Sequence, residues 1–363
     1  KAGFEHFMMK EIHEQPKAVE DTLRSVCTDG SIDLEKTGLT RDAVASFRQV
    51  WVIGCGSAYH VGVAAQYVLE DLAKIPVRVE LASEFRYRDP LVPENTLVVI
   101  ISQSGETADS LAALRKAKEQ GAKTLAIVNV VGSTIAREAD YVFYTLAGPE
   151  IAVATTKAYS AQLLAVYALA IAFAQGRGQL TDDQAAALVR ELESLPGKME
   201  RLLEDEERIQ WFASKQIAAK DIFFIGRGLD YAISLEGSLK MKEISYIHSE
   251  AYAAGELKHG TISLIEPGTL VVGVLTQQKL YEKTLSNLLE CKTRGAYLMA
   301  LTTYGNYSME DNADFVLYIP KTDPHFAPSL AVIPLQLLGY YVSVAKGLDV
   351  DKPRNLAKSV TVE

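Results

Sequence analysis

The feature that most constrains this fold is an internal duplication that covers most of the chain. Segment 52–56, which contains two glycines, resembles segment 224–228, located 172 residues further on. Segment 96–99 matches segment 269–272 at a spacing of 173 residues, and further short matches follow at 174. A nearly constant spacing over separate patches indicates two copies of one domain, and a period as long as a domain excludes a solenoid.

Within the first copy, short runs rich in Val and Ile alternate with helical segments. Strands are predicted at 50–53, 77–81, 97–101, 124–128 and 141–144, and helices at 58–72, 108–119 and 157–174. Apolar runs without polar alternation are typical of a parallel sheet covered on both faces. Alternation of strands and helices predicts an α/β fold with two doubly wound parallel sheets, whose ligands bind beyond the carboxyl ends of the strands.

The pattern predicts five regions. They are a helical leader (1–48), a first domain (49–178), a helical connector (179–217), a second domain (218–348) and a C-terminal tail (349–363). The connector is acidic and poor in glycine, so a helical segment is expected there rather than a loose linker.

Composition excludes several classes of protein. With 363 residues, 48% of them hydrophobic, the chain can bury a core, and its net charge of −9 argues against a nucleic-acid-binding surface. The three cysteines are far apart and no histidines pair at ligand spacing, so neither a disulfide framework nor a metal site is expected. The longest apolar run, 163–174, is shorter than the roughly 20 residues of a membrane span. A buried helix and a cytoplasmic location are expected.

The strongest local signal for binding is segment 102–107, Ser-Gln-Ser-Gly-Glu-Thr, between a predicted strand and a predicted helix. Helix-start N–H groups and the helix dipole favour an anion, and three hydroxyls add donors. The alternative is that Ser104 or Thr107 only caps the helix, but capping requires a single such residue. We therefore expect a phosphate here, with segments 55–57 and 155–157 at comparable loop ends.

A dehydrogenase is the alternative that the fold alone suggests, because Gly54 and Gly56 follow a strand. The third glycine of the dinucleotide fingerprint is replaced by Tyr59, and a lone glycine pair is a weak signal. The pair is better explained as a tight turn that allows close approach of a ligand.

Four side chains are candidates for acid–base or nucleophilic chemistry. His259 lies in a polar, glycine-flanked segment, 255–260. Lys240 and Glu243 share one face of a predicted helix, either as a surface ion pair or at the mouth of a pocket. Lys358, in the tail, has an amine that can form a Schiff base with a ketose, although a terminal lysine is usually solvated.

Four features of the sequence carry a family resemblance: segment 102–107, the paired Gly-x-Gly turns, segment 253–260 and the ending 353–363. Together they resemble the glucosamine-6-phosphate synthase family, also called glutamine–fructose-6-phosphate transaminases (isomerising). The resemblance covers essentially the whole chain. It corresponds to the isomerase half, a tandem of sugar isomerase (SIS) domains, and implies that a glutaminase domain is missing from this chain. Because the chain lacks an initiator Met, we expect it to be part of a longer polypeptide.

The resemblance implies roles for individual residues. Glu243 matches the general base, His259 the ring-opening residue supplied by the neighbouring subunit of a homodimer, and Lys358 the Schiff-base lysine, with Lys240 close to the reacting atoms. The implied substrate-binding residues are Cys55, Gly56, Ser57, Ser102, Gln103, Ser104, Thr107, Val153, Thr155 and Ala357.

The implied ligands are fructose 6-phosphate, glucose 6-phosphate or glucosamine 6-phosphate, without a cofactor, metal, nucleic acid or membrane. The implied reaction is the first step of hexosamine synthesis. Two departures from the family pattern, Ala58 and Thr261, are expected to alter affinity rather than chemistry. A tandem SIS deglycase and a sugar-phosphate sensor that does no chemistry remain alternatives.

Overall fold

The computed structural model describes residues 1–363 and separates into two compact units, each with one five-stranded sheet. The first-copy unit comprises Glu14–Glu150, Thr155–Pro196 and Ala357–Glu363. The second-copy unit comprises Lys1–His13, Ile151–Ala154 and Gly197–Leu356.

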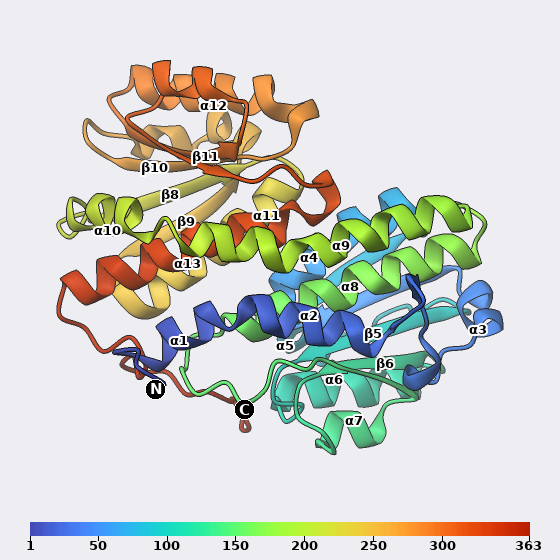
Figure 1. The fold of residues 1–363 in the computed structure, drawn as a ribbon. Helices are drawn as coiled ribbons and strands as arrows, with labels where there is room; N and C mark the ends of the chain where they lie inside the picture. Colours follow the sequence, from blue (N-terminus) through green and yellow to red (C-terminus); the bar gives the residue numbers. More distant parts are fainter. The chain divides into compact units, whose positions relative to one another are not determined.

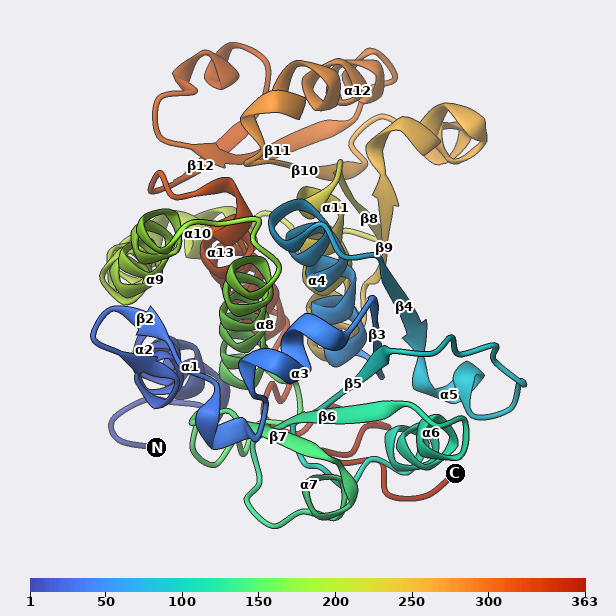
Figure 2. The ribbon, with the colours of Figure 1, turned by 90° about the vertical axis from the view of Figure 1, so that its right-hand side faces the viewer.

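The first-copy unit contains a parallel sheet in the order β4-β3-β5-β6-β7. Its strands are β3 (Gln49–Gly54), β4 (Val77–Leu81), β5 (Thr96–Ser102), β6 (Lys123–Val128) and β7 (Tyr141–Tyr144). Its helices are α2 (Gln15–Ser25), α3 (Arg41–Ser46), α4 (Ser57–Ala73), α5 (Ala82–Phe85), α6 (Ala108–Glu119), α7 (Thr134–Glu138) and α8 (Lys157–Gly176). Figure 2 shows α4 and α8 on one face of this sheet and α5 and α6 on the other. Because both faces are covered, the central strand β5 is buried at every position.

The second-copy unit contains a parallel sheet in the order β9-β8-β10-β11-β12. Its strands are β8 (Asp221–Gly226), β9 (His248–Ala253), β10 (Leu270–Leu275), β11 (Tyr297–Thr303) and β12 (Phe315–Ile319). Its helices are α1 (Phe7–His13), α10 (Glu206–Ser214), α11 (Leu229–Ser245), α12 (Tyr281–Thr293) and α13 (Ala327–Ala345). Short 3-10 helices are η2 (Ala254–His259), η3 (Thr261–Leu264), η4 (Gln278–Leu280), η5 (Tyr307–Asp311) and η6 (Pro324–Phe326). In Figure 1, α12 covers one face of the sheet, and α11 and α13 cover the other.

The backbone of the two units confirms the duplication. Both sheets place their second strand at one edge, followed by the first, third, fourth and fifth. Gly56 (φ 58°, ψ −127°) and Gly228 (φ 61°, ψ −128°) have the same conformation, and each precedes a 17-residue helix. Asp140 accepts the N–H of Thr124 in β6, and Asp314 accepts the N–H of Leu298 in β11, at 2.9 and 2.7 Å.

The predicted α/β fold with two doubly wound parallel sheets is confirmed. Strands and helices predicted at 77–81, 108–119 and 141–144 have the same bounds in the structure. The predicted helix that carries Lys240 and Glu243 is α11, which begins at Leu229, directly after the Gly228 turn. The leader is not wholly helical, because β1 (Cys27–Thr28) and β2 (Ser31–Ile32) form an antiparallel ribbon before η1 (Glu35–Thr37).

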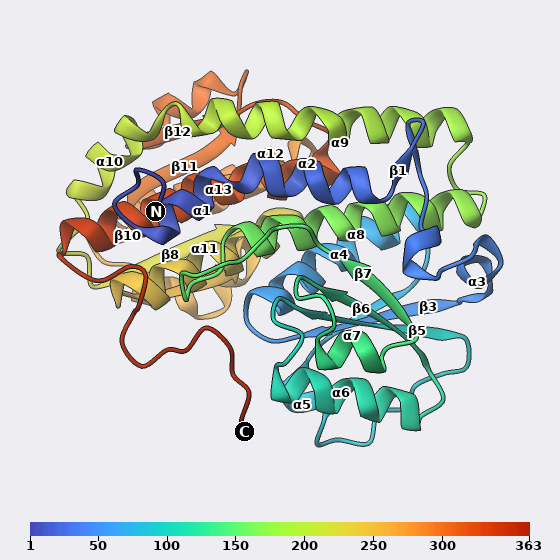
Figure 3. The same ribbon diagram turned by 60° about the horizontal axis from the view of Figure 1, so that its bottom comes forward.

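The long helix α9 (Asp182–Leu203) and the tail complete the chain. The connector predicted over 179–217 is helical, since α9 and α10 fill most of it. Residues 349–363 contain no helix or strand, and the chain ends as an extended coil (Figure 3).

Two helical segments are long and apolar enough to span a membrane by length and composition alone, Lys157–Gly176 and Pro324–Ala345. In both, 89% of the most apolar window is buried inside the structure. The run 163–174 lies in the first of them, so the prediction of a buried helix is confirmed.

Candidate active site

The loop 102–107 is held by its own hydroxyl groups at the carboxyl end of β5. Ser102 Oγ accepts the N–H of Gly105 at 3.0 Å and lies 2.9 Å from Thr107 Oγ1. Thr107 stands at the N-cap of α6 but its side chain caps no N–H of the helix. The capping explanation for Thr107 is therefore wrong, whereas the Ser104 hydroxyl accepts the N–H of Glu106, at 3.1 Å, within the loop.

Gly105 is required for this loop conformation. Its φ is +67°, a region that favours glycine, and a Cβ placed there would lie 2.0 Å from Ser133 Oγ. The carbonyl of Gly105 also accepts the N–H of Ile135 at 3.0 Å. The loop is thus fixed tightly against α7 before α6 begins.

The C-terminal tail lies against this loop. Ser359 Oγ lies 3.1 Å from Ser104 Oγ, and the carbonyl of Val360 accepts the N–H of Ala108 at 3.0 Å. Arg86 and Glu363 form a further ion pair at 3.6 Å. These contacts bring Lys358, which precedes Ser359, into the neighbourhood of the predicted phosphate loop.

Lys358 is paired with a carboxylate that sequence reasoning missed. Its ammonium contacts Glu150, whose side chain is 0% exposed. Glu150 also accepts a hydrogen bond from Thr155 Oγ1 at 2.5 Å and the N–H of Ala158 at 2.9 Å. Burial opposes the negative charge, but the Lys358 ammonium and these donors outweigh it and lower the pKa of Glu150. The available signal was an acidic residue between the predicted strand 141–144 and the predicted binding segment 155–157.

The segment 55–57 forms the turn from β3 into α4. Ser57 is buried at the first position of α4, after the positive φ of Gly56. Cys55 Sγ lies 3.8 Å from Ser110 Oγ, and burial raises the pKa of the Cys55 thiol. Because the thiolate is the nucleophilic form of cysteine, a raised pKa favours a role for Cys55 in lining the site.

The second-copy unit holds a buried cluster of charges on α11. Lys240 Nζ lies 2.7 Å from Glu243 Oε1 and 3.3 Å from Glu236 Oε1. Lys240 and Glu236 are fully buried, and 15% of the Glu243 side chain is exposed. Burial alone would lower the pKa of Lys240, but the two carboxylates raise it, so this lysine stays charged. The pair is not a surface ion pair, and Glu236, four residues before Lys240, was missed.

The remaining predicted residues are more exposed than the charged cluster on α11, or they lie in loops. His259 is exposed at the end of η2, before Gly260 with φ +137°. In the same unit, the N–H of Val153 donates to the Asp351 carbonyl at 3.1 Å. Gln103 is half-buried and its carbonyl accepts the N–H of Asn129, whereas Ala357 is exposed.

The predicted residues therefore fall into two groups. The first-copy unit contains Cys55, Gly56, Ser57, Ser102, Gln103, Ser104, Thr107, Thr155, Ala357 and Lys358. The second-copy unit contains Val153, Lys240, Glu243 and His259. No group of three His, Cys, Asp or Glu side chains is arranged to hold a metal ion.

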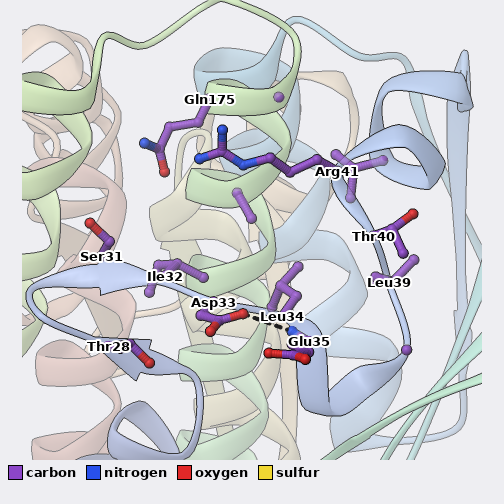
Figure 4. Close-up of a pocket in the computed structure, with 14 residues that line it drawn as sticks. Thr28, Ser31, Ile32, Asp33, Leu34, Glu35, Leu39, Thr40, Arg41 and Gln175 are labelled. Carbon is purple, nitrogen blue, oxygen red and sulfur yellow. Dashed lines mark hydrogen bonds between the residues drawn. The ribbon is translucent and has the colours of Figure 1, made fainter.

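A separate cavity of about 420 Å³ lies in the first-copy unit, lined by β2, η1, α3 and the end of α8. Figure 4 shows Arg41 and Gln175 among its lining residues, with Asp33 accepting the N–H of Glu35 at 3.0 Å. None of the predicted site residues lines this cavity.

Comparison with known proteins agrees with this architecture. The SIS domain family matches residues 44–172 and 217–346, one stretch in each copy. The chain therefore belongs to the SIS domain family.

Particular members of that family are similar to the chain over its full length. "Glutamine--fructose-6-phosphate aminotransferase [isomerizing]" from Caldanaerobacter subterraneus subsp. tengcongensis is 55% identical over 100% of this chain. The protein of the same name from Methanosarcina mazei is 47% identical over 100% of it. The chain spans only 60% and 59% of the length of these two relatives.

A solved structure covers the same portion. The C-terminal domain of glucosamine-fructose-6-phosphate aminotransferase from Francisella tularensis superposes with a TM-score of 0.93 at 41% identity. The match covers 97% of this chain and 99% of that one. The chain thus corresponds to the C-terminal domain of such an aminotransferase.

Proposed function

We propose that this chain is the isomerase part of an enzyme that makes glucosamine 6-phosphate from fructose 6-phosphate and glutamine-derived ammonia. The observation that carries the proposal is the hydrogen bond between Ser359 and Ser104, which keeps the amine-bearing tail beside the loop 102–107. The names of the relatives support the same reaction. Release of ammonia from glutamine is assigned to the part of the relatives that this chain does not cover.

The substrate phosphate is expected to bind at the loop 102–107. Hydroxyl and N–H donors there satisfy phosphate oxygens, and the start of α6 adds the favourable end of its dipole. Binding energy from the phosphate orients the distant reacting carbons without taking part in the chemistry. Segment 55–57, with Val153, Thr155 and Ala357, is proposed to contact the sugar.

The cyclic form of fructose 6-phosphate hides its carbonyl, so ring opening requires a proton donor and acceptor. His259 is suited to this step, because an imidazole ring can both donate and accept a proton and the side chain is exposed at the end of η2. We assign it to a sugar bound by the other subunit of a homodimer.

Lys358 then condenses with the open-chain ketone. Its unprotonated amine attacks C2, the C2–O bond is lost as water, and a C2=N imine forms. Ammonia replaces the lysine at C2 and regenerates the free amine. Because the Lys358 ammonium is paired with Glu150, it must leave that carboxylate and lose a proton before it attacks.

Glu243 moves the proton that completes the isomerisation. Its carboxylate removes a proton from C1 and returns one to C2, which leaves an amine at C2 and an aldehyde at C1. The buried Lys240 ammonium lies 2.7 Å from Glu243 Oε1 and 3.3 Å from Glu236 Oε1, so one positive charge attracts two carboxylates. Lys240 thereby keeps a general base ready while fixing its position.

Two further assignments accompany this function. We place the boundaries of the regions at 1–48, 49–178, 179–217, 218–348 and 349–363. The chemistry of sugar phosphates and free thiols fits a location in the cytosol.

Reductive trapping tests the assignment of Lys358. The chain is incubated with fructose 6-phosphate and sodium borohydride, digested and analysed by mass spectrometry. We expect the mass of a reduced hexose phosphate on Lys358, and none in the Lys358→Ala variant. Lys352→Ala, which removes an exposed lysine of the same tail, is the matched control and should trap normally. An adduct on another lysine, or none in the parent chain, would remove Lys358 from the mechanism.

A further inference from the structure

The second copy contains a counterpart of the phosphate loop, at residues 275–280. Leu275 ends β10 and Tyr281 begins α12, as Ser102 ends β5 and Ala108 begins α6, so the spacing is 173 residues. The sequence of the second loop is Leu-Thr-Gln-Gln-Lys-Leu, so Gln277 replaces Ser104 and Gln278 replaces Gly105. The compact first-copy loop depends on that glycine, and in the second copy η4 begins in its place.

A carboxylate of the chain itself is bound at this second loop. Asp230 accepts the N–H of Thr276 at 2.9 Å and the N–H of Gln277 at 3.2 Å, and it also accepts the Thr276 hydroxyl. Asp230 is 1% exposed and lies in the first turn of α11. Two successive N–H groups and one hydroxyl are the kind of donors that a phosphate oxygen would use.

The first copy has no such carboxylate. The residue that matches Asp230, at a spacing of 172, is Ala58, which has no polar side-chain atom. Gly54 and Gly226, four residues earlier, both let a helix start close to its strand, since an added Cβ would lie 3.0 Å from the carbonyl carbon of Ala58 and 2.5 Å from that of Asp230. The position that carries the buried carboxylate in the second copy therefore carries only a methyl group in the first.

We propose that Asp230 closes the second-copy loop to phosphate, so that each chain binds one sugar phosphate, at loop 102–107. The Asp230 carboxylate already accepts hydrogen bonds from the donors that a phosphate would need. A phosphate bound beside it would also be repelled by its buried negative charge. Burial raises the pKa of Asp230 to about 7, whereas its three donors favour the ionised form. The inference rests on the proposed function, because that function places the sugar phosphate at the first-copy loop.

Equilibrium binding on the complete chain tests this proposal. Fructose 6-phosphate is titrated into the parent and into a Ser104→Ala/Thr107→Ala double variant by calorimetry at pH 8. We expect one site per chain in the parent and at least a hundredfold weaker binding in the double variant. Two sites in the parent would overturn the closed loop while leaving the proposed function intact. A single parent-like site that survives in the double variant would overturn the inference together with the phosphate site proposed at loop 102–107. No binding to the parent would instead refute the proposed function, and this inference with it.

The role of Asp230 is tested by opening the loop. Inorganic phosphate is titrated into the Asp230→Ser variant, whose folding is checked by circular dichroism. We expect two phosphates per chain, and the added site should persist when Ser104 and Thr107 are also replaced. A folded Asp230→Ser chain that still binds one phosphate contradicts the proposal. If the Asp230→Ser variant does not fold, the number of sites measured in the parent and in the double variant decides whether the second-copy loop is closed to phosphate.

Discussion

Replacing Glu150 by Gln should release the C-terminal tail from the phosphate loop. The substitution keeps the size of the side chain but removes its charge and one of its two acceptor oxygens. The Glu150 side chain is 0% exposed and contacts the Lys358 ammonium, the Thr155 hydroxyl and the N–H of Ala158. The variant leaves these donors incompletely paired, and the tail keeps only its weaker contacts.

The size of the effect follows from the burial of the pair. Removal of one partner from a buried ion pair costs roughly 3–5 kcal/mol. The Lys358 side chain is 26% exposed, so water can partly solvate the unpaired ammonium and the lower end of that range applies. A loss of about 3 kcal/mol raises the population of the released tail roughly 100-fold.

Hydrogen exchange at the Ala108 amide measures this release directly, because that N–H donates to the Val360 carbonyl of the tail. In Glu150→Gln we expect its exchange to accelerate about 100-fold, whereas the Thr124 amide, held by Asp140, should be unchanged. Glu138→Gln, which breaks an exposed pair with Arg115, is the matched control and should have no measurable effect. Equal exchange of the Ala108 amide in the parent and in Glu150→Gln would refute the conclusion that the ion pair between Glu150 and Lys358 holds the tail on the loop.

The ion pair between Glu150 and Lys358 also predicts how attachment of the tail depends on pH. The pKa of Glu150 is lowered in the folded chain, so its contribution is present above the unfolded value of about 4.3 and is lost as pH falls through the folded value. The difference between the parent and Glu150→Gln should therefore be constant near neutral pH and shrink in acid. A difference that grows on acidification contradicts the assigned ion pair.

Three further predictions concern the proposed catalysis. Ser104→Ala or Thr107→Ala should weaken binding of hexose phosphate by about 1.5–3 kcal/mol with little effect on turnover of bound substrate; unchanged dissociation constants in calorimetry would remove the phosphate from this loop. Glu243→Gln should bind ligand but lose about 10²–10⁴-fold in exchange of the C1 proton, measured by NMR in D₂O; near-normal exchange would assign the base to another residue. Mixing inactive His259→Ala and Lys358→Ala chains should partly restore activity, because one site of the heterodimer keeps both residues. Absence of recovery, with heterodimers shown by native mass spectrometry, would place His259 in its own subunit's site.

The fold was largely predictable from the sequence because its determinants are local or repeated. Runs of Val and Ile in 50–53 and 97–101 mark the central strands, and the matching turns at Gly56 and Gly228 mark the duplication. The β1–β2 ribbon was not predictable, since two-residue strands carry no periodic pattern.

The site was predictable only in part, because the burial of charged residues depends on tertiary packing. The spacing of Lys240 and Glu243 fits a surface pair equally well, and only the packed helix α11 shows that Lys240 is buried. Glu150 meets Lys358 from 208 residues away, a distance at which no sequence pattern operates. Roles for Glu243, His259 and Lys358 came from family resemblance rather than from spacing.

The central claim is that this chain alone carries out aldose–ketose isomerisation of a hexose phosphate. The most direct measurement is NMR of fructose 6-phosphate incubated with the chain in D₂O, without glutamine or ammonia. The account predicts that glucose 6-phosphate accumulates, that solvent deuterium enters at the C1 and C2 positions between which the proton moves, and that Glu243→Gln abolishes both changes. If the chain binds fructose 6-phosphate but neither exchanges the C1 proton nor forms glucose 6-phosphate, it is a sugar-phosphate sensor and the proposed catalysis is wrong.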